Sequence, residues 1–177
     1  ISGGLGLAIA QLARQHNVRI IGTVSNESKI SKLEKIGISN IIVHTKDDVE
    51  SEVNRMTNGM GVDLAIDPVG GKALEKAIQS TKYRGRVISV GNASRSNNTV
   101  DISLLMRKNI SFHGVLLAAE QSKNFLRVYE LVTSLLQDVA SHKLKVYIDK
   151  IYPFNEASAA HEHAESRNAF GRVIIKI

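Results

Sequence analysis

The sequence predicts a doubly wound α/β domain built on a parallel sheet. Strand and helix patterns alternate roughly every 20 to 25 residues, as in βαβ crossover units. The expected strands are short apolar runs, which suits strands covered by helices on both faces. The chain has 177 residues, of which 43% are hydrophobic, and this is enough to bury one sizeable core. These observations together favour a Rossmann-type architecture.

The elements follow from periodicity and from turn signals. A helix is expected behind the opening glycines as far as Gln15, because Leu5, Ile9 and Leu12 recur at helical spacing. The remaining helices are predicted at 28–37, 46–59, 72–82, 103–109, 120–142 and 155–166. Strands are predicted at 18–24, 40–45, 62–67, 85–91, 110–117, 145–154 and 171–177, with a loop at 92–99. The first of these strands reads as fully buried.

Two features of this pattern concern domain organisation. The glycine turn has no strand written before it, so we expect the sheet to lack a first strand that would end at about Ile1. A gap, a distorted edge or a neighbouring chain is expected in that place. The last strand, helix and strand need no further crossover, and we expect them to pack apart from the main sheet. The predicted division is 1–145 for the main domain and 146–177 for this appendage.

Composition excludes several classes of function. The chain has no cysteine, hence no disulfide, thiolate nucleophile or cysteine-based zinc site within it. No apolar run approaches the roughly 20 residues that span a bilayer, and no signal-like segment appears, so we expect a cytoplasmic protein without membrane contact. The charge of +6 is scattered, which a phosphate-bearing small molecule explains as well as nucleic acid does. His161 and His163 lie on different helix faces, so we expect no metal site.

The opening glycines are the first candidate site. Gly3 and Gly4 would let the backbone approach a pyrophosphate, and Gly6 would allow close helix packing, with the helix N-terminus facing the anion. An ordinary tight turn is the alternative.

The segment after the second predicted strand indicates which dinucleotide would bind. An Asp or Glu there would bond the ribose hydroxyls of NAD, whereas this chain has Ser25, Asn26 and Lys29. Neutral donors and a cation suit the 2′-phosphate of NADPH. A serine in this turn could also simply cap a helix. His44 ends the next strand, where its ring could cover the adenine ribose or donate to the phosphate, or lie on the surface without a role.

Three later strand ends complete the candidate site. Asp67 is followed by Pro68 and two glycines, a turn that lets a flat ligand pass, so we favour cofactor lining over catalysis. Gly91 and Asn92 end a strand that faces the same crevice. The segment 115–117 offers an apolar floor with free backbone groups for a carboxamide, although core packing also explains its valine and leucines.

Read together, these stretches resemble the medium-chain dehydrogenase/reductase superfamily, within it the zinc-independent quinone oxidoreductases related to zeta-crystallin. The resemblance rests on "ISGGLG" followed by "QLAR", on "IIGTVSNESK", "DPVG" and "GRVISVG", and on the closing "AHEHAESRNAFGRVIIKI". Several ordered motifs at compatible spacing are more specific than one glycine loop. One departure is Ile1, which stands where the family has Gly or Ala. Another is that the family's GroES-like catalytic domain is not written in this chain.

The resemblance implies a role for each matching position. Gly3, Gly4 and Leu5 would lie at the pyrophosphate, Ser25 and Lys29 at the 2′-phosphate, and His44 beside the adenosine phosphate. Val69 and Asn92 would line the adenosine and ribose, Val115 and Leu117 the nicotinamide, and Arg167 would return to the cofactor from the C-terminal tail. It also implies that the segment 146–177 returns to the catalytic domain and that the protein forms a homodimer.

The leading hypothesis is therefore the cofactor-binding part of an NADPH-dependent reductase that passes hydride to a quinone or an α,β-unsaturated carbonyl, inactive by itself. No catalytic residue is assigned. The alternatives within the superfamily are a zinc-type alcohol dehydrogenase and an enoyl-thioester reductase. Outside it stands a non-catalytic nucleotide- or RNA-binding module, which the absence of a basic stripe disfavours. A methyltransferase that binds S-adenosylmethionine would need an acidic residue at the end of the strand 18–24 to bond the ribose. This chain has Val24 and Ser25 there instead.

Overall fold

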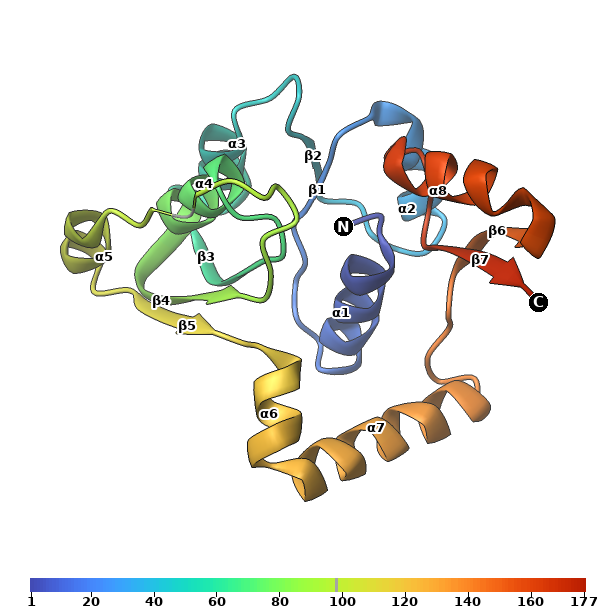
Figure 1. Cartoon of the computed structure of the whole chain (residues 1–177). Helices are drawn as coiled ribbons and strands as arrows, with labels where there is room; N and C mark the ends of the chain where they lie inside the picture. The colour runs from blue at the N-terminus through green and yellow to red at the C-terminus, as the bar shows by residue number, and fades with distance from the viewer. Residues whose placement is uncertain (98) are drawn as a thin grey trace. The chain divides into compact units, whose positions relative to one another are not determined.

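The computed structural model describes residues 1–97 and 99–177 (Figure 1). The chain divides into two compact units: unit 1 comprises Ile1–Asp47 and Leu131–Ile177, and unit 2 comprises Asp48–Glu130. The strands form three sheets in the described part of the chain, with orders β1-β2, β3-β4-β5 and β6-β7, and every pairing within them is parallel. The predicted α/β class with parallel strands is therefore confirmed.

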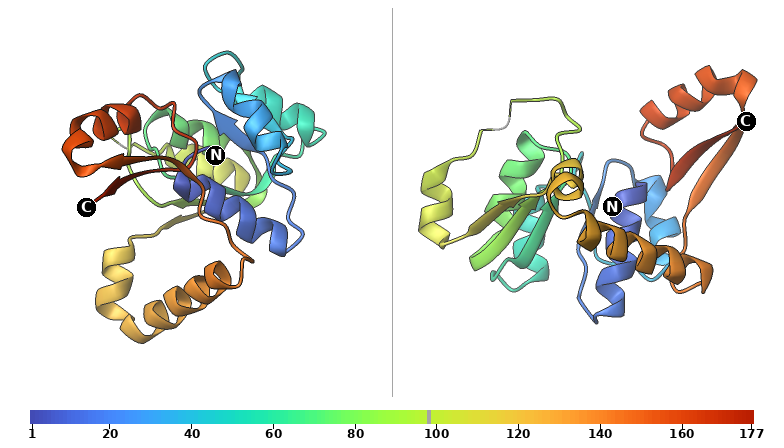
Figure 2. Two further views of the ribbon diagram at one scale, coloured as in Figure 1. Left: turned by 90° about the vertical axis from the view of Figure 1, so that its right-hand side faces the viewer. Right: turned by 60° about the horizontal axis from the view of Figure 1, so that its bottom comes forward.

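Unit 1 holds the glycine turn and the C-terminal segment. Its elements are α1 (Gly4–Gln15), β1 (Gly22–Val24), η1 (Glu27–Lys29), α2 (Ile30–Glu34), β2 (Ile41–Val43), β6 (Ile148–Pro153), η2 (Phe154–Glu156), α8 (Ala157–Glu165) and β7 (Arg172–Lys176). Helix α8 lies along the pair formed by β6 and β7 (Figure 2). This pair forms a two-stranded sheet of its own.

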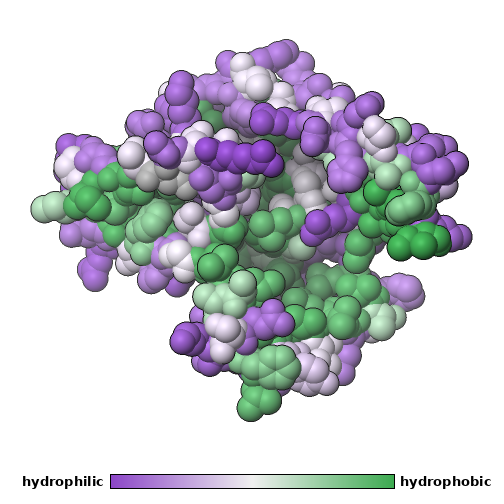
Figure 3. Space-filling view, in the orientation of Figure 1, coloured by the Kyte–Doolittle hydropathy of each residue, from purple (hydrophilic) through white to green (hydrophobic). Residues whose placement is uncertain are grey.

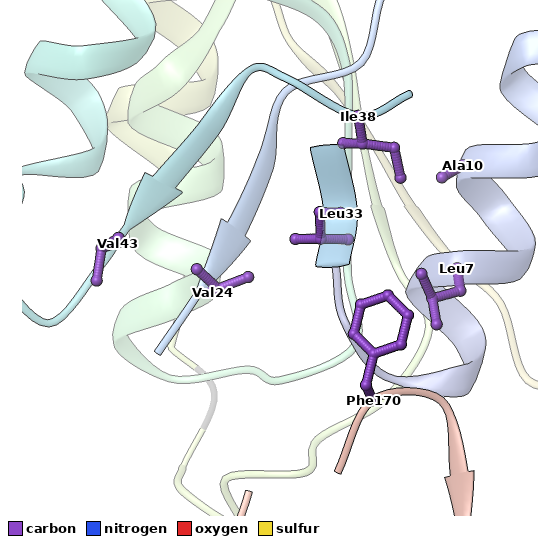
Figure 4. Packing of buried hydrophobic residues seen from close by; sticks show 7 residues of the cluster. All are labelled: Leu7, Ala10, Val24, Leu33, Ile38, Val43 and Phe170. Carbon is purple, nitrogen blue, oxygen red and sulfur yellow. The ribbon is translucent and has the colours of Figure 1, made fainter. Parts of the chain in front are cut away.

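The core of unit 1 joins the two ends of the chain. Its buried members come from α1, β1, α2, β2 and the segment before β7: Leu7, Ala10, Val24, Leu33, Ile38, Val43 and Phe170. Figure 4 shows the Phe170 ring lying between Leu33 and Leu7. The C-terminal segment therefore supplies part of the apolar interior on which β1 and α2 pack.

Unit 2 is a three-stranded sheet with its helices. Its elements are α3 (Val49–Met56), β3 (Val62–Asp67), α4 (Lys72–Ser80), β4 (Thr81–Ser89), α5 (Ile102–Lys108), β5 (Ser111–Gly114) and α6 (Leu117–Lys123). Buried Leu74 and Ile78 on one face of α4 pack with Val87 of β4, and partly buried side chains from the α5 region surround them. The periodicity of α4 thus places one apolar face on the sheet, as predicted.

Of the predicted strands, the one at 62–67 has the observed bounds, and the others differ in length or position. The strand predicted at 18–24 is wrong in length and burial, because only Gly22–Val24 is a strand, Thr23 is exposed and Val18 is 54% exposed. Strand β1 pairs with β2 over three residues, and in the described chain residues 18–21 have no strand to bond. The strand predicted at 110–117 ends at Gly114, where its pairing with β4 ends.

The single helix predicted at 120–142 is also corrected. The structure has two helices, α6 and α7 (Phe125–Ala140), separated by Asn124. The backbone of Asn124 leaves helical angles (φ −133°, ψ 47°), and its side-chain amide donates to the Glu120 carboxylate. No described side chain of α7 is fully buried, and apolar residues gather over this helix in Figure 3.

Two further observations complete the fold. The loop predicted at 92–99 is irregular in its described residues, and Asn98 lies outside them. Within residues 1–97 and 99–177, every helix is too short or too polar to cross a membrane.

Candidate functional site

The glycine turn forms the start of α1. Gly3 is the N-cap residue in an extended conformation, and its carbonyl accepts the first helical hydrogen bond from the Leu7 N–H group (3.0 Å). The N–H groups of Gly4, Leu5 and Gly6 precede that bond, and no described side chain caps the helix. Unsatisfied N–H groups together with the helix dipole make such an end attractive to an anion.

Each glycine of the turn has a different packing requirement. A Cβ on Gly6 would lie 2.5 Å from the Ile1 carbonyl oxygen, so the close approach predicted for this position is present. A Cβ on Gly4 would collide with the side chain of Arg172. A Cβ on Gly3 would meet nothing within 4 Å. The space beside Gly3 is therefore open.

Arg172 is a candidate that sequence reasoning missed. It begins β7, and its side chain packs against Gly4 at the glycine turn. The preceding residue, Gly171, forms a parallel bridge with Gly3 and donates its N–H to the Ser2 carbonyl (2.8 Å). The motif "FGRVIIKI" contained the signal, a basic residue directly after a glycine, but we interpreted it only as a closing strand.

The carboxyl ends of β1 and β2 bring Ser25, Asn26 and His44 into neighbouring turns. The His44 N–H donates to the Val24 carbonyl (3.0 Å), and the Thr45 hydroxyl donates to the Ser25 carbonyl (2.9 Å). The Asn26 side chain accepts the Ser28 N–H (2.9 Å) and caps η1. A cap is thus present in this turn, supplied by the asparagine.

A carboxylate also lies in this region. Glu27 is exposed, and its carboxylate pairs with the Lys46 ammonium at 2.8 Å. An exposed pair of this kind is worth little energetically, but it offsets the negative charge of the turn.

Lys29 is buried, and its ammonium is already engaged. The side chain is 6% exposed, and Nζ donates to the carbonyls of Arg167 and of Ala169, the latter at 3.2 Å. Burial lowers the pKa of Lys29 below its ordinary value, while the charge of Asp149 opposes that shift. These bonds bring Lys29 and Arg167 together.

In unit 2 the turn after β3 is organised by Asp67. Its buried carboxylate accepts the N–H groups of Val69 (3.1 Å) and Gly70 (2.9 Å). Both carboxylate oxygens are therefore occupied by the turn itself. Val69 lies exposed at the tip of this turn.

An open groove lies at the carboxyl ends of β4 and β5, with a volume of about 740 Å³. Gly91, Asn92 and Val115 line it together, as the sequence predicts for strand ends that face one crevice. Leu117 begins α6 and is not part of the lining, whereas its neighbour Leu116 is. The Asn92 side-chain amide donates to the Ser96 carbonyl (2.8 Å), so it also holds the following loop.

A charged pair borders this groove. The Arg127 guanidinium donates to the Glu120 carboxylate at 3.1 Å, and both residues belong to the lining. Sequence reasoning missed them because it placed both in one continuous helix, at 120–142. A smaller hollow of about 360 Å³ in unit 1 is lined by later residues of α1 and contains none of the predicted site residues.

The two histidines near the C-terminus make different contacts. The His163 ring lies between the Tyr152 hydroxyl (Nδ1, 3.0 Å) and the Asp149 carboxylate (Nε2, 3.1 Å), while His161 is exposed. Among the described residues, no cluster of three or more His, Cys, Asp or Glu side chains is placed to hold a metal ion.

The predicted site residues thus divide between the two units. The set in unit 1 consists of Gly3, Gly4, Leu5, Gly6, Ser25, Asn26, Lys29, His44 and Arg167, and the set in unit 2 consists of Val69, Gly91, Asn92, Val115 and Leu117. Within unit 1 the Lys29 ammonium bonds the Arg167 carbonyl, and within unit 2 Gly91, Asn92 and Val115 share the groove lining.

Known proteins share this sequence and fold. Residues 4–134 match the family model described as zinc-binding dehydrogenase. The probable quinone oxidoreductase of Schizosaccharomyces pombe is 30% identical over 98% of this chain, which spans 52% of that protein. Quinone oxidoreductase 1 of Escherichia coli is 28% identical over 98% of this chain and 54% of its own length.

Solved structures give the same result. The E. coli quinone oxidoreductase complexed with NADPH superimposes with a TM-score of 0.87 at 27% identity, over 99% of this chain and 55% of that one. The quinone oxidoreductase of Pseudomonas syringae pv. Tomato DC3000 gives the same TM-score and identity, over 99% and 54%. The chain spans about half the length of these relatives. It belongs to the zinc-binding dehydrogenase family, and the resemblance to the medium-chain dehydrogenase/reductase superfamily is confirmed.

Proposed function

We propose that this chain is the NADPH-binding part of an oxidoreductase that transfers hydride to a quinone or an α,β-unsaturated carbonyl. The observation that carries the proposal is a start of α1 that no described side chain caps, together with an end of β1 that bears Ser25 and Asn26 instead of an acid. The similarity to the E. coli quinone oxidoreductase, a protein whose structure holds NADPH, supports it.

The residues of unit 1 suit the phosphates of the cofactor. The helix N-terminus would accept the pyrophosphate, with the Arg172 side chain beside Gly4 as a cation. The end of β1, with Lys29 and Arg167 close by, would accept the 2′-phosphate and the adenosine ribose. Glu27 is held by Lys46, which offsets its repulsion of a 2′-phosphate.

The residues of unit 2 suit the nicotinamide. Gly91, Asn92 and Val115 line an open groove with both apolar walls and backbone groups, which is what a flat ring with a carboxamide requires. When bound, NADPH supplies a hydride from its nicotinamide ring, and the acceptor takes up that hydride and a proton from solvent or protein. The chain's own contribution is to bind and orient the ring, and we assign Val69, in the turn after β3, and Leu117, at the start of α6, to the same task.

The acceptor and the assembly are part of the same proposal. We assign the acceptor to the quinone and enone class because the relatives include quinone oxidoreductases and a 2-haloacrylate reductase of Burkholderia. In the whole protein we expect residues 1–145 to form the cofactor domain and 146–177 to return to a GroES-like catalytic domain. A homodimer in the cytoplasm and an inactive isolated chain remain predictions.

Equilibrium titration with NADPH and NADH tests the proposal. We expect NADPH to bind about 10- to 100-fold more tightly, since hydrogen bonds to a charged phosphate contribute roughly 1.5–3 kcal/mol. Arg172→Gln should weaken both cofactors, because both carry the pyrophosphate. Arg107→Gln on α5 is the matched control and should leave both affinities unchanged. Equal affinity for the two cofactors would refute the 2′-phosphate assignment.

A further inference from the structure

The smaller hollow of unit 1 lies between the second half of α1, the turn after α2 and the segment that leads to β6. Its volume is about 360 Å³, within the range of pockets that hold small molecules. Leu7, Ala10 and Ile38 are the buried apolar members of its lining. Figure 4 shows Ile38 directed toward Ala10 of α1. The apolar part of a ligand would therefore meet an apolar floor.

The wall formed by residues 143–147 is fixed to α1. The Gln11 side chain bonds both backbone groups of Lys145: its amide donates to the carbonyl (3.0 Å), and its oxygen accepts the N–H group (2.8 Å). The half-buried Tyr147 ring, also in the lining, contacts the Phe170 ring edge-on, with the ring centres 5.9 Å apart. Contacts between segments distant in the sequence therefore hold this hollow open.

Arg14 brings a positive charge to the edge of this floor. It belongs to the lining, and its guanidinium donates to the Ile36 carbonyl. Gly37, which has φ +78°, allows the guanidinium to pack on the turn, because a Cβ there would lie 2.8 Å from Arg14 Nη1. Within residues 1–97 and 99–177, no carboxylate forms an ion pair with Arg14. The guanidinium is thus positioned by backbone, and its charge has no partner.

The other polar groups around the hollow do not cancel this charge. Among the described residues the lining includes no acid, and its second cation, Lys143, is 70% exposed and lies 3.8 Å from the Asp138 carboxylate. At the C-terminal end of α1 the Ala13 carbonyl accepts the N–H groups of His16 (3.1 Å) and Val18 (3.0 Å). These bonds reduce the repulsion that the end of a helix exerts on an anion.

We propose that this hollow is a second ligand site, which binds a small amphipathic anion, namely a carboxylate on an apolar body. The body would lie on Leu7, Ala10 and Ile38, and the carboxylate would accept hydrogen bonds from Arg14, whose planar guanidinium suits two carboxylate oxygens. A short fatty acid and an arylalkanoic acid share this chemistry. The site goes beyond the proposed function, since its lining contains none of the residues assigned to the cofactor.

Amide NMR titration of the whole chain with hexanoate and with 4-phenylbutyrate tests the proposal. We expect saturable shifts at residues 7–15, 36–38 and 143–147, and the acid that binds more tightly identifies the alkyl or the aryl class. 1-Hexanol has the same chain as hexanoate without the charge and should bind about tenfold more weakly. Acetate has the charge without the chain and should not bind. Equal affinity for hexanoate and 1-hexanol, no saturation by either acid, or shifts that gather on α7 instead would overturn the proposal.

Variants at the edge of the hollow test which cation binds the carboxylate. Arg14→Met keeps an apolar stem and should weaken hexanoate binding about tenfold while leaving 1-hexanol binding unchanged. Lys143→Met should have a smaller effect, because its ammonium already faces Asp138. Lys35 is exposed and lies directly before Ile36 but outside the lining, so Lys35→Met is the matched control and should change neither affinity. Unchanged hexanoate affinity in Arg14→Met would overturn the proposal.

A competition experiment separates this site from the proposed cofactor site. Hexanoate should bind the free chain and the chain saturated with NADPH with the same affinity. Displacement of hexanoate by NADPH would place the acid in the cofactor site and overturn the proposal. If NADPH itself does not bind, the proposed function fails, and the titrations with hexanoate and 1-hexanol still decide whether the second site exists.

Discussion

The two units present their candidate residues in contrasting ways. In unit 1 two of the candidates are tied to the C-terminal segment: Gly3 forms a backbone bridge with Gly171, and the Lys29 side chain donates to the Arg167 carbonyl. In unit 2, Gly91, Asn92 and Val115 line an open groove at the ends of β4 and β5, where the Asn92 amide bonds its own loop and the Val115 N–H donates to the Ser89 carbonyl. Under the proposed function, the cofactor phosphates would meet residues held by the C-terminal segment, whereas the nicotinamide ring would meet an open groove.

The largest expected effect concerns whether the two units are stabilised separately. Leu33 in unit 1 and Leu74 in unit 2 are 0% and 2% exposed. Each Leu→Ala variant should lower the free energy of unfolding by about 2–5 kcal/mol, since it removes buried apolar contacts and leaves a cavity. Urea titration measures the total loss of unfolding free energy in each variant. Amide exchange should accelerate mainly in unit 1 for Leu33→Ala and mainly in unit 2 for Leu74→Ala, and uniform acceleration in both would contradict the division.

The second prediction concerns the anchoring of the C-terminal segment. Gly171 has φ +98°, and a Cβ there would collide with the Tyr147 carbonyl. Gly171→Ala should therefore destabilise unit 1 by about 1–3 kcal/mol and weaken 2′,5′-ADP binding. Gly59 in unit 2 has φ +79° with open space around it, so Gly59→Ala is a matched control with a cost of about 1 kcal/mol and unchanged binding. An equal loss of unfolding free energy in the two variants would show that the C-terminal segment at Gly171 is not constrained.

The third prediction tests the groove. Val115 is 47% exposed, so Val115→Asp should change stability by less than about 0.5 kcal/mol. It should weaken NADPH about tenfold, because the new carboxylate must lose water when a ring covers it. Calorimetric titration should find 2′,5′-ADP binding unchanged, since that ligand lacks the nicotinamide. Leu126→Asp on α7, outside the groove lining, should affect neither ligand. A similar loss for both ligands would remove the distinction between the two units.

The smallest effect is a pH dependence confined to unit 2. A hydrogen bond from Lys76, followed by bonds from Ser51, lowers the pKa of Asp48 from 3.8 to about 2. Because the folded value lies below the unfolded one, this contribution is present above about pH 4 and is lost as the pH falls toward 2. Asp48→Asn should remove this part of the pH dependence of the stability of α3 and α4. Circular dichroism during an acid titration measures that dependence. The exposed Glu165 provides the control variant Glu165→Gln, and an unchanged acid profile for Asp48→Asn would contradict the prediction.

Much of the fold followed from periodicity, because local patterns carry it. Strand β3 has the predicted bounds, and α1, α4 and α5 have the predicted places. The errors lie where pairing with a neighbouring strand determines how long a strand is. Residues 18–21 have strand composition but no partner strand in the described chain, and Val115 has an apolar side chain beyond the end of the β4 pairing. Strand length depends on the neighbouring strand, which a local pattern does not contain.

The candidate site was predictable as far as it follows the rule that ligands bind at the carboxyl ends of parallel strands. The rule placed Gly91, Asn92 and Val115 in one groove. It did not predict that Lys29 would be buried against backbone carbonyls, or that Arg172 would lie at Gly4, because both contacts join segments more than 130 residues apart.

The most direct test of this division between phosphate and ring recognition is an amide NMR titration of the chain with 2′,5′-ADP and, separately, with nicotinamide mononucleotide. We expect 2′,5′-ADP to shift the amides of residues 3–6, 25–29 and 167, whereas the mononucleotide should shift those of residues 91, 92 and 115. Shifts by both ligands at one common set of residues, or no response to 2′,5′-ADP at the glycine turn and the end of β1, would contradict it.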